Sequence, residues 1–357
     1  MHNKKITLIY GNYPSNERLY DFMLPLKRFF IGHGFSVTSS RNLRANTTNI
    51  IIEEFCEDPF LIEKMEKFKL QKKGKIVVVL TEFLTGNYLN SFSLKTRFIN
   101  ALAHVYFNMP TIHKKTQRTL QSTIQKTDRP SLSATEKFLV CILKKFKTGE
   151  MNIAYDIAEI NYFHRRLNGI NYAIPYVDLW LGYYRDQIKN WKSLLSNIVL
   201  FNFSPPHYKK NSESKKKYDF YFSGKLTQKR KKILDQLNKH FKVYYPKKGY
   251  LSPQERDAIL KESKFLLCLP RTDNWPYSSA TRSWNALENG VIPINLNRYV
   301  LTDWEAHLGL PQVNLFTVKE LKLLLYRYDE IRSRVILKCQ NNKNFAAVDL
   351  LESINTI

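Results

Sequence analysis

The chain has 357 residues, and its 56 Lys and Arg against 31 Asp and Glu give a formal net charge of +25 at pH 7. This length exceeds the usual size of one domain, about 100–200 residues, so two domains are the first expectation. A hydrophobic share of 43% excludes a wholly disordered chain. The sequence contains no run of about 18 uncharged apolar residues, which argues against a transmembrane helix.

The chain start and the cysteines favour a cytoplasmic protein. The first residues lead directly into a strand-like segment, without the apolar core of a signal peptide. The cysteines show no CxxC spacing, so we expect reduced core thiols instead of disulfides or a zinc site. They are Cys56, Cys141, Cys268 and Cys339. The positive charge fits three partners: nucleic acid, an anionic membrane surface, or a phosphate-bearing substrate.

In the first half of the chain, predicted strands alternate with predicted helices. Apolar runs predict strands at 5–10, 35–38, 49–55, 75–81 and 177–182, the last of which is expected to end this half. Helical spacing predicts helices at 17–30, 61–70, 93–107 and 153–167. Pro25 lies inside the first of these and favours a kink or a break there. Strands separated by helices indicate a parallel sheet that is covered on both faces.

One basic segment within residues 113–147 has two interpretations. Residues 135–146 place five apolar side chains on one side of a helix that basic residues flank: Phe138, Leu139, Ile142, Leu143 and Phe146. An ordinary surface helix explains this pattern, and so does a contact with a membrane surface. Both interpretations stay open.

The second half repeats the alternation after a stretch rich in Pro, Ser and Lys. Strands are predicted at 218–222, 241–245, 264–269 and 291–295, and helices at 228–237, 252–261, 279–289 and 318–328. Ser252, Pro253 and Glu255 form a capping-box pattern. We therefore expect two doubly wound, Rossmann-like α/β domains that face each other across a cleft. Residues 1–200 form the first domain, 201–217 a linker and 218–357 the second.

Ligands on such sheets bind at the carboxyl ends of strands, near helix N-termini, and two loops of the second half fit this description. In the first, Ser223, Gly224, Lys225 and Arg230 surround the start of a helix. Neither the Walker A pattern nor the GxGxxG pattern occurs there, and a basic solvated turn is the alternative. The second loop offers a helix N-terminus with hydroxyl and guanidinium donors for a diphosphate. Its candidates are Arg271, Tyr277, Ser278, Ser279, Arg282 and Asn285, with Tyr277 or Trp275 as a platform for a base. A capped structural helix is the alternative.

The second half resembles the C-terminal half of GT-B glycosyltransferases, with exostosin-like and CgeB-like groups as the closest patterns. Residues 263–271 (SKFLLCLPR), Ser278-Ser279, Arg282, Ala286-Leu287 and residues 290–294 carry this resemblance over about 75 residues. Residues 220–224 (FYFSG) with Arg230 resemble the entry strand of the same domain. Residues 32–37 (GHGFSV) are similar to a turn common in the N-terminal half of these enzymes. The glutamate that precedes Ala-Leu in the family is Asn285 here, in a run that also resembles fucosyltransferases.

The resemblance implies a nucleotide-sugar donor held by the second domain and an acceptor held by the first. Arg282 with Ser278 and Ser279 would face the donor phosphates, and Gly224 with Lys225 would approach them. No metal or other cofactor is expected, because helix dipoles and basic side chains stabilise a leaving diphosphate. Inversion would need a general base, for which Glu82 is best placed. Glu53, Glu54, His33 and His164 are weaker candidates.

Three hypotheses remain. The first is a cytoplasmic glycosyltransferase that builds a surface glycan on a glycan or lipid-linked acceptor, peripheral to the inner face of the membrane. The second is a basic nucleic-acid-binding protein. Two observations argue against it: the basic residues are spread along the chain, and no RNA-recognition or zinc-finger pattern occurs. We therefore expect no nucleic-acid partner. The third is a nucleotide- or sugar-binding module without catalysis.

Overall fold

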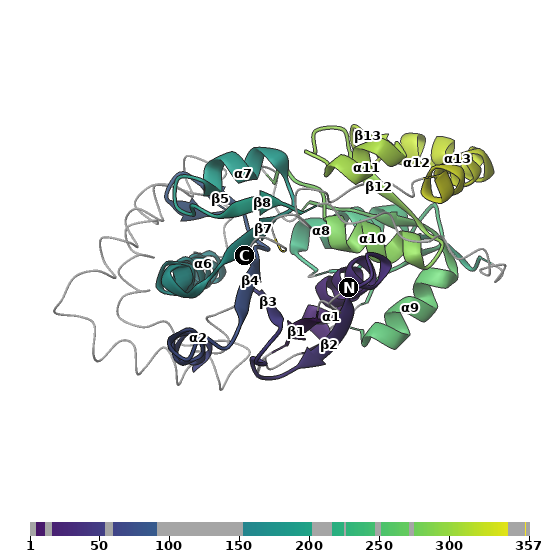
Figure 1. The fold of residues 1–357 in the computed structure, drawn as a ribbon. Coiled ribbons are helices and arrows are strands. Elements are labelled where there is room, and N and C mark those ends of the chain that lie inside the picture. The colour runs from purple at the N-terminus through teal and green to yellow at the C-terminus, as the bar shows by residue number, and fades with distance from the viewer. Residues whose placement is uncertain are drawn as a thin grey trace. The chain divides into compact units, whose positions relative to one another are not determined.

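The computed structural model describes residues 5–10, 16–53, 60–90, 153–201, 216–224, 226–246, 251–270, 275–341 and 354 (Figure 1). It divides into two compact units. The first is Met1–Glu53, Glu63–Thr81 and Tyr176–Ile357, and the second is Glu54–Ile62 and Glu82–Pro175. The predictions for residues 93–107 and 113–147 and for most of the linker lie outside the described residues, as do Cys56 and Cys141.

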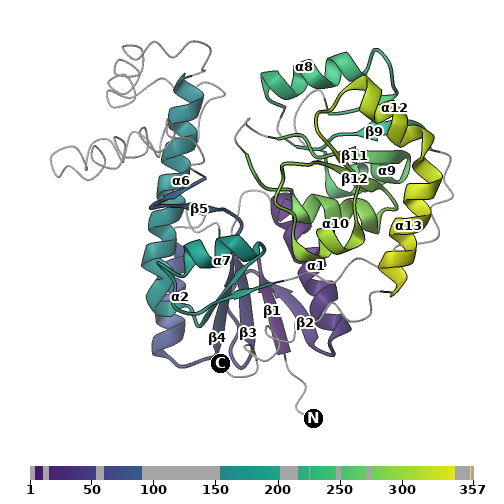
Figure 2. The same cartoon turned by 90° about the horizontal axis from the view of Figure 1, so that it is seen from above.

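Within the described chain the first unit contains a parallel sheet of the order β2-β1-β3-β4-β7-β8, of which Figure 2 labels β1, β2, β3 and β4. Its strands are β1 (Lys5–Ile9), β2 (Ser36–Ser40), β3 (Thr48–Ile52), β4 (Lys75–Val79), β7 (Leu179–Gly182) and β8 (Ile198–Leu200). The central strands β3 and β4 are runs of Ile and Val, and four of the five residues in each are buried. Such continuous apolar runs form strands that helices cover on both faces.

Helical crossovers join most of these strands. They are α1 (Asn16–Gly32), α2 (Phe60–Leu70) and α7 (Arg185–Trp191). Helix α1 continues through Pro25, so the predicted break does not occur. The prediction that the strand at 177–182 ends this half is wrong, because α7 and the short β8 follow β7. Strand β8 has only three residues, which is too short for a sequence period to reveal.

The first unit also contains a second parallel sheet, of the order β10-β9-β11-β12-β13 in the described part of the chain. Its strands are β9 (Tyr218–Tyr221), β10 (Val243–Tyr244), β11 (Ser263–Leu267), β12 (Ile292–Leu296) and β13 (Gln312–Val313). Its helices are α8 (Gln228–Leu237), α9 (Pro253–Lys261), α10 (Ala280–Glu288), α11 (Asp303–Leu308), α12 (Val318–Tyr326) and α13 (Tyr328–Asn341). The predicted capping box is confirmed at α9, where Ser252 and Glu255 bond each other's backbone N–H.

The second unit has its own short elements. The strands β5 (Leu84–Thr85) and β6 (Tyr88–Leu89) form an antiparallel hairpin, and α6 (Ile153–Ala173) packs on β6. A 3₁₀ turn (Ile174–Tyr176) follows α6. Gly86, with φ of 61°, takes the left-handed conformation that the hairpin turn needs.

These elements confirm the α/β class with two parallel, Rossmann-like sheets. The sheets are built from residues 5–200 and 218–313, and both belong to the first compact unit. The division into domains 1–200 and 218–357, with a cleft between them, stays a prediction. Among the described residues no helix is long and apolar enough to cross a membrane. Cys268 and Cys339 are free and buried, and burial raises the pKa of the Cys268 thiol to about 12.

Candidate functional site

The order of the second sheet defines a switch point between β9 and β11. From β9 the chain moves to β10 on one side, and it then returns to β11 on the other side. In open α/β sheets, ligands bind outside the carboxyl ends of the strands at such a point. The loops after β9 and β11 are the two that the sequence singled out, and they contain Gly224 and Ser279.

Arg282 and Gly224 join these two loops. Arg282 lies in the first turn of α10, and its Nη1 donates to the carbonyl of Ser223 at 3.3 Å. Gly224 has φ of 131°, and a Cβ at this position would lie 3.2 Å from the same Nη1. Only glycine combines this backbone conformation with such a close approach. The structure thus brings together two residues that the sequence predicted to share a site.

Helix α10 is buried along almost its whole length. The helix has nine residues, and all of them are buried except Arg282, which is half-buried. A cation at the N-terminus opposes the helix dipole, so helix stability does not explain an arginine there. An anion bound at the same N-terminus would be attracted both by the dipole and by the guanidinium.

Two further predicted residues of α10 carry unused polar groups. Ser279 is the N-cap, but its side chain makes no capping hydrogen bond. Asn285 lies one turn beyond Arg282 and is only 4% exposed. Its Nδ2 has no hydrogen-bond partner among the described residues. A buried donor without a partner is rare, and it suits a ligand that supplies an acceptor.

Arg230 fixes the neighbouring loop. Its side chain is 4% exposed, and it donates from Nε to the carbonyl of Pro270 at 3.0 Å and from Nη2 to that of Leu269 at 2.8 Å. The guanidinium also lies over the Phe222 ring, 5.3 Å from the centroid. Arg230 therefore holds the end of β11 against the start of α8, and a direct contact with a ligand stays a prediction.

Tyr277 and Ser278 make buried contacts with the protein. The Tyr277 hydroxyl donates to Asp186 Oδ2 at 2.6 Å and accepts from Gln187 Nε2 at 2.5 Å. The Ser278 hydroxyl donates to Glu305 Oε2 at 2.5 Å. Their predicted roles, stacking on a base and contacting phosphate, stay predictions, but these observed contacts fix the segment that leads into α10.

Glu305 and Asp186 are structural partners that the sequence reasoning missed. Glu305 is fully buried, and its Oε2 also accepts from the N–H and hydroxyl of Thr302 at 3.1 and 2.8 Å. Burial raises the pKa of Glu305, and the hydrogen bonds from Ser278 and Thr302 oppose that shift. Thr302 and Glu305 form a capping box on α11, so their Thr-x-x-Glu spacing was a usable signal. Nothing local marked Asp186.

Two predicted residues, Lys225 and Arg271, lie outside the described residues. The described candidates of the second sheet fall into two groups. Gly224, Arg282, Ser279 and Asn285 offer backbone space or donors, whereas Arg230, Tyr277 and Ser278 hold the loops.

Glu82 is bound on both carboxylate oxygens. It forms an ion pair with Arg166, which is 2% exposed, and it accepts from Asn90 Nδ2 at 2.6 Å. Asn90 in turn closes the β5–β6 hairpin through hydrogen bonds with the backbone of Phe83. The observed contacts of Glu82 therefore connect the hairpin with α6. Its role as general base stays a prediction.

The weaker base candidates also have local partners. Glu53 is fully buried and accepts from Thr81. His33 Nδ1 lies 2.8 Å from the carbonyl of Phe29, and His164 Nε2 lies 3.3 Å from Asn168 Nδ2. Glu54 lies outside the described residues. Within the described ranges no cluster of three His, Cys, Asp or Glu side chains could hold a metal ion.

Comparison with known proteins yields a likeness to solved structures. No protein-family model matches the chain, and no curated protein matches it. A solved structure of an alpha-glucosyltransferase in complex with UDP and a 13-mer DNA containing a HMU base aligns with 98% of this chain and 99% of its own. The TM-score is 0.49 and the sequence identity is 13%. At these values the likeness is too weak to assign a ligand or a reaction.

Proposed function

We propose that the protein is a GT-B-type glycosyltransferase that moves a sugar from a nucleotide-sugar donor to an acceptor. The half-exposed Arg282 at the N-terminus of the otherwise buried helix α10, against the Cβ-free face of Gly224, supports this proposal most directly. A diphosphate fits this arrangement because it can accept from the guanidinium and from free backbone N–H groups. The surrounding sequence resembles glycosyltransferases, and this resemblance is the reason to expect a sugar attached to the diphosphate.

The donor site would use four described residues. Arg282 would neutralise the diphosphate that leaves during transfer, and the first turn of α10 would supply backbone N–H donors. Asn285 would bond a hydroxyl of the nucleotide or the sugar through its unused Nδ2. Gly224 would let the backbone approach the phosphates. As part of the proposal, these groups stabilise the leaving group without a bound metal.

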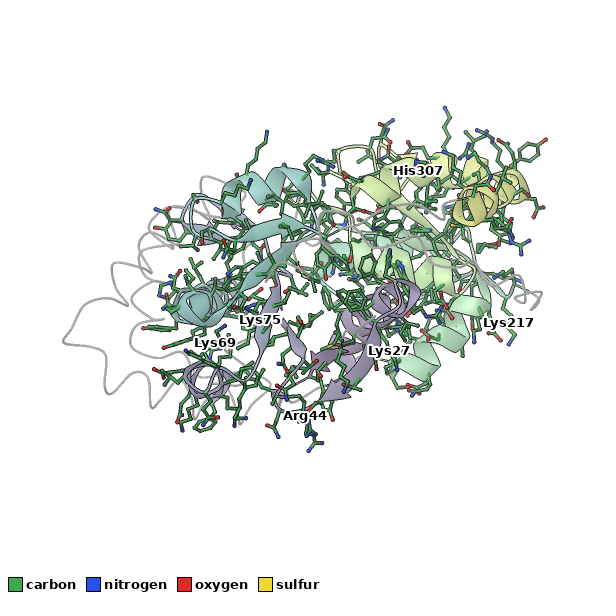
Figure 3. The ribbon with its side chains drawn as sticks, viewed as in Figure 1. Lys27, Arg44, Lys69, Lys75, Lys217 and His307 are labelled. Carbon is green, nitrogen blue, oxygen red and sulfur yellow. The ribbon has the colours of Figure 1, made fainter. Side chains whose placement is uncertain are left out.

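The distribution of charge favours a phosphate-bearing substrate over a nucleic acid. The basic residues labelled in Figure 3 belong to different parts of the described chain, among them Lys27 on α1, Lys69 on α2 and Lys75 on β4. Several are already paired: Lys69 and Lys75 with Asp178, and Lys217 with Glu262. A nucleic-acid surface needs a continuous row of cations along the phosphate backbone.

The proposed function extends to the acceptor and to the place in the cell where the protein acts. We infer a glycan or lipid-linked acceptor in surface polysaccharide synthesis, in the cytoplasm and peripheral to an anionic membrane. The net charge of +25 supports attraction to such a membrane and to nucleotide-sugars.

A thermal-shift panel of UDP, GDP, CMP, ADP and dTDP tests the proposed function. A nucleotide that binds only the folded state raises Tm, by an amount that grows with its concentration relative to Kd. With water in place of the acceptor, the matching nucleotide-sugar should then be hydrolysed slowly to the free sugar and the nucleotide, in the presence and in the absence of EDTA. Binding without hydrolysis or transfer would support a non-catalytic module. Failure of all five nucleotides, together with nanomolar, steeply salt-dependent oligonucleotide binding, would contradict the enzyme.

A further inference from the structure

The hydroxyl of Tyr184 connects the first sheet with the start of α10. Tyr184 follows β7 and is 4% exposed. Its hydroxyl donates to the carbonyl of Ser278 at 2.8 Å and lies 3.2 Å from the Ser278 hydroxyl. Ser278 is the residue directly before the N-cap of α10. A side chain of one sheet thus reaches the helix N-terminus at the switch point of the other sheet.

In other helices of this sheet the N-cap side chain holds the first turn: Thr227 accepts from Arg230, Ser252 from Glu255 and Thr317 from Glu320. Ser279 makes no such bond at α10. There the hydrogen bond from Tyr184 holds Ser278, the residue before the N-cap, from a position 94 residues earlier in the chain.

We propose that Tyr184 is a positioning residue of the donor site, because it holds the residue before the N-cap of α10 from the first sheet and so fixes the first turn that carries Arg282. This inference rests on the proposed function. Ser278 is held from two sides, since Tyr184 bonds its carbonyl and Glu305 accepts from its hydroxyl. The carbonyl of Val300 accepts from the Ser278 N–H at 3.2 Å.

The first turn of α10 has backbone N–H groups that make no hydrogen bond within the helix. The first backbone bond inside α10 runs from the N–H of Ser283 to the carbonyl of Ser279, so the N–H groups of Ala280, Thr281 and Arg282 have no partner within the helix. These three N–H groups remain for the phosphates, beside the Arg282 guanidinium. Losing the tyrosine hydroxyl would loosen the turn and leave the Ser278 carbonyl without this donor.

Tyr184→Phe tests the inference, with Tyr183→Phe as the matched control. Tyr183 is the neighbouring buried tyrosine, whose ring packs near Phe22 and Phe201. Loss of one buried hydrogen bond corresponds to a change of about fivefold. In Tyr184→Phe we expect amide hydrogen exchange at residues 280–282 to be about fivefold faster than in the wild type. UDP affinity should fall about fivefold, and the preference for UDP over UMP should shrink.

Tyr183→Phe should leave the exchange at 280–282 and the preference for UDP over UMP unchanged, whatever it does to Tm. Unchanged exchange in Tyr184→Phe would overturn the inference, as would equal effects of the two variants. The exchange measurement needs no ligand. If the wild type binds no nucleotide, the proposed function fails, and hydrogen exchange still decides whether Tyr184 holds the start of α10.

Discussion

Two arginines of the described chain, the buried Arg166 and the half-buried Arg282, have different surroundings. Arg166 is matched by the carboxylate of Glu82, and the two charges neutralise each other. No acidic side chain of the described chain pairs with Arg282, which contacts the carbonyl of Ser223 and the face of Gly224. The ion pair of Arg166 with Glu82 stabilises the fold. Arg282 has no such counter-charge and lies beside the backbone of Gly224, which suits an anionic ligand.

The largest expected effect concerns the matched pair. Glu82→Gln should lower the free energy of unfolding by about 3–5 kcal/mol, because it leaves the buried Arg166 guanidinium without its counter-charge. Urea denaturation measures this change. Adding Arg166→Met should restore part of the stability, because an apolar side chain of similar length removes the buried charge. If Glu82→Gln is as stable as the wild type, the Glu82–Arg166 pair does not stabilise the fold, and the contrast with Arg282 is wrong.

The next effect concerns the unmatched cation. Arg282→Ala should weaken nucleotide binding by about 2–3 kcal/mol through loss of charge-assisted hydrogen bonds to phosphate. Calorimetry with the nucleotide that passes the thermal-shift panel measures this loss. Arg327→Ala is the control, because it changes the net charge equally but removes an ion pair with Glu330 on another helix. Unchanged affinity in Arg282→Ala would refute its role.

Gly224→Ala should have a smaller effect on both the free energy of unfolding and the nucleotide affinity. Its φ of 131° strains any residue with a Cβ, which costs about 1–2 kcal/mol of stability. The new Cβ would also push Arg282 away, so nucleotide affinity should fall as well. Gly309→Ala, at φ of 61° on the C-cap of α11, imposes similar strain elsewhere. If both variants bind nucleotide like the wild type, the close approach at Gly224 does not serve a ligand.

The smallest effect is a pH slope from Glu305. Burial raises its pKa above the ordinary 4.5 of a glutamate, so between those two values the folded state binds more protons than the unfolded state. Its contribution to stability is therefore complete below pH 4.5 and declines as pH rises through the folded-state pKa. The stability of the wild type minus that of Glu305→Gln should fall with rising pH. A difference that grows with pH would contradict the buried, raised-pKa carboxyl.

Local patterns predicted much of this fold, whereas contacts between distant segments could not be predicted. Helix α8 begins and ends where its apolar spacing predicts, and the capping box of α9 is visible in the sequence. The pairing of Tyr277 with Asp186 joins residues 91 positions apart, one in the loop before α10 and the other on α7. Tyr277 therefore looked like a free aromatic platform. Glu82 likewise looked like a free base, because its partner Arg166 lies 84 positions away.

The central claim is that the switch point of the second sheet binds a nucleoside diphosphate. Amide hydrogen exchange with and without the nucleotide that raises Tm tests it at the level of single segments. The account predicts slower exchange at residues 223–224 and 279–283, where the glycine loop meets the first turn of α10. A protein that binds the nucleotide without any protection in these two segments would contradict the account.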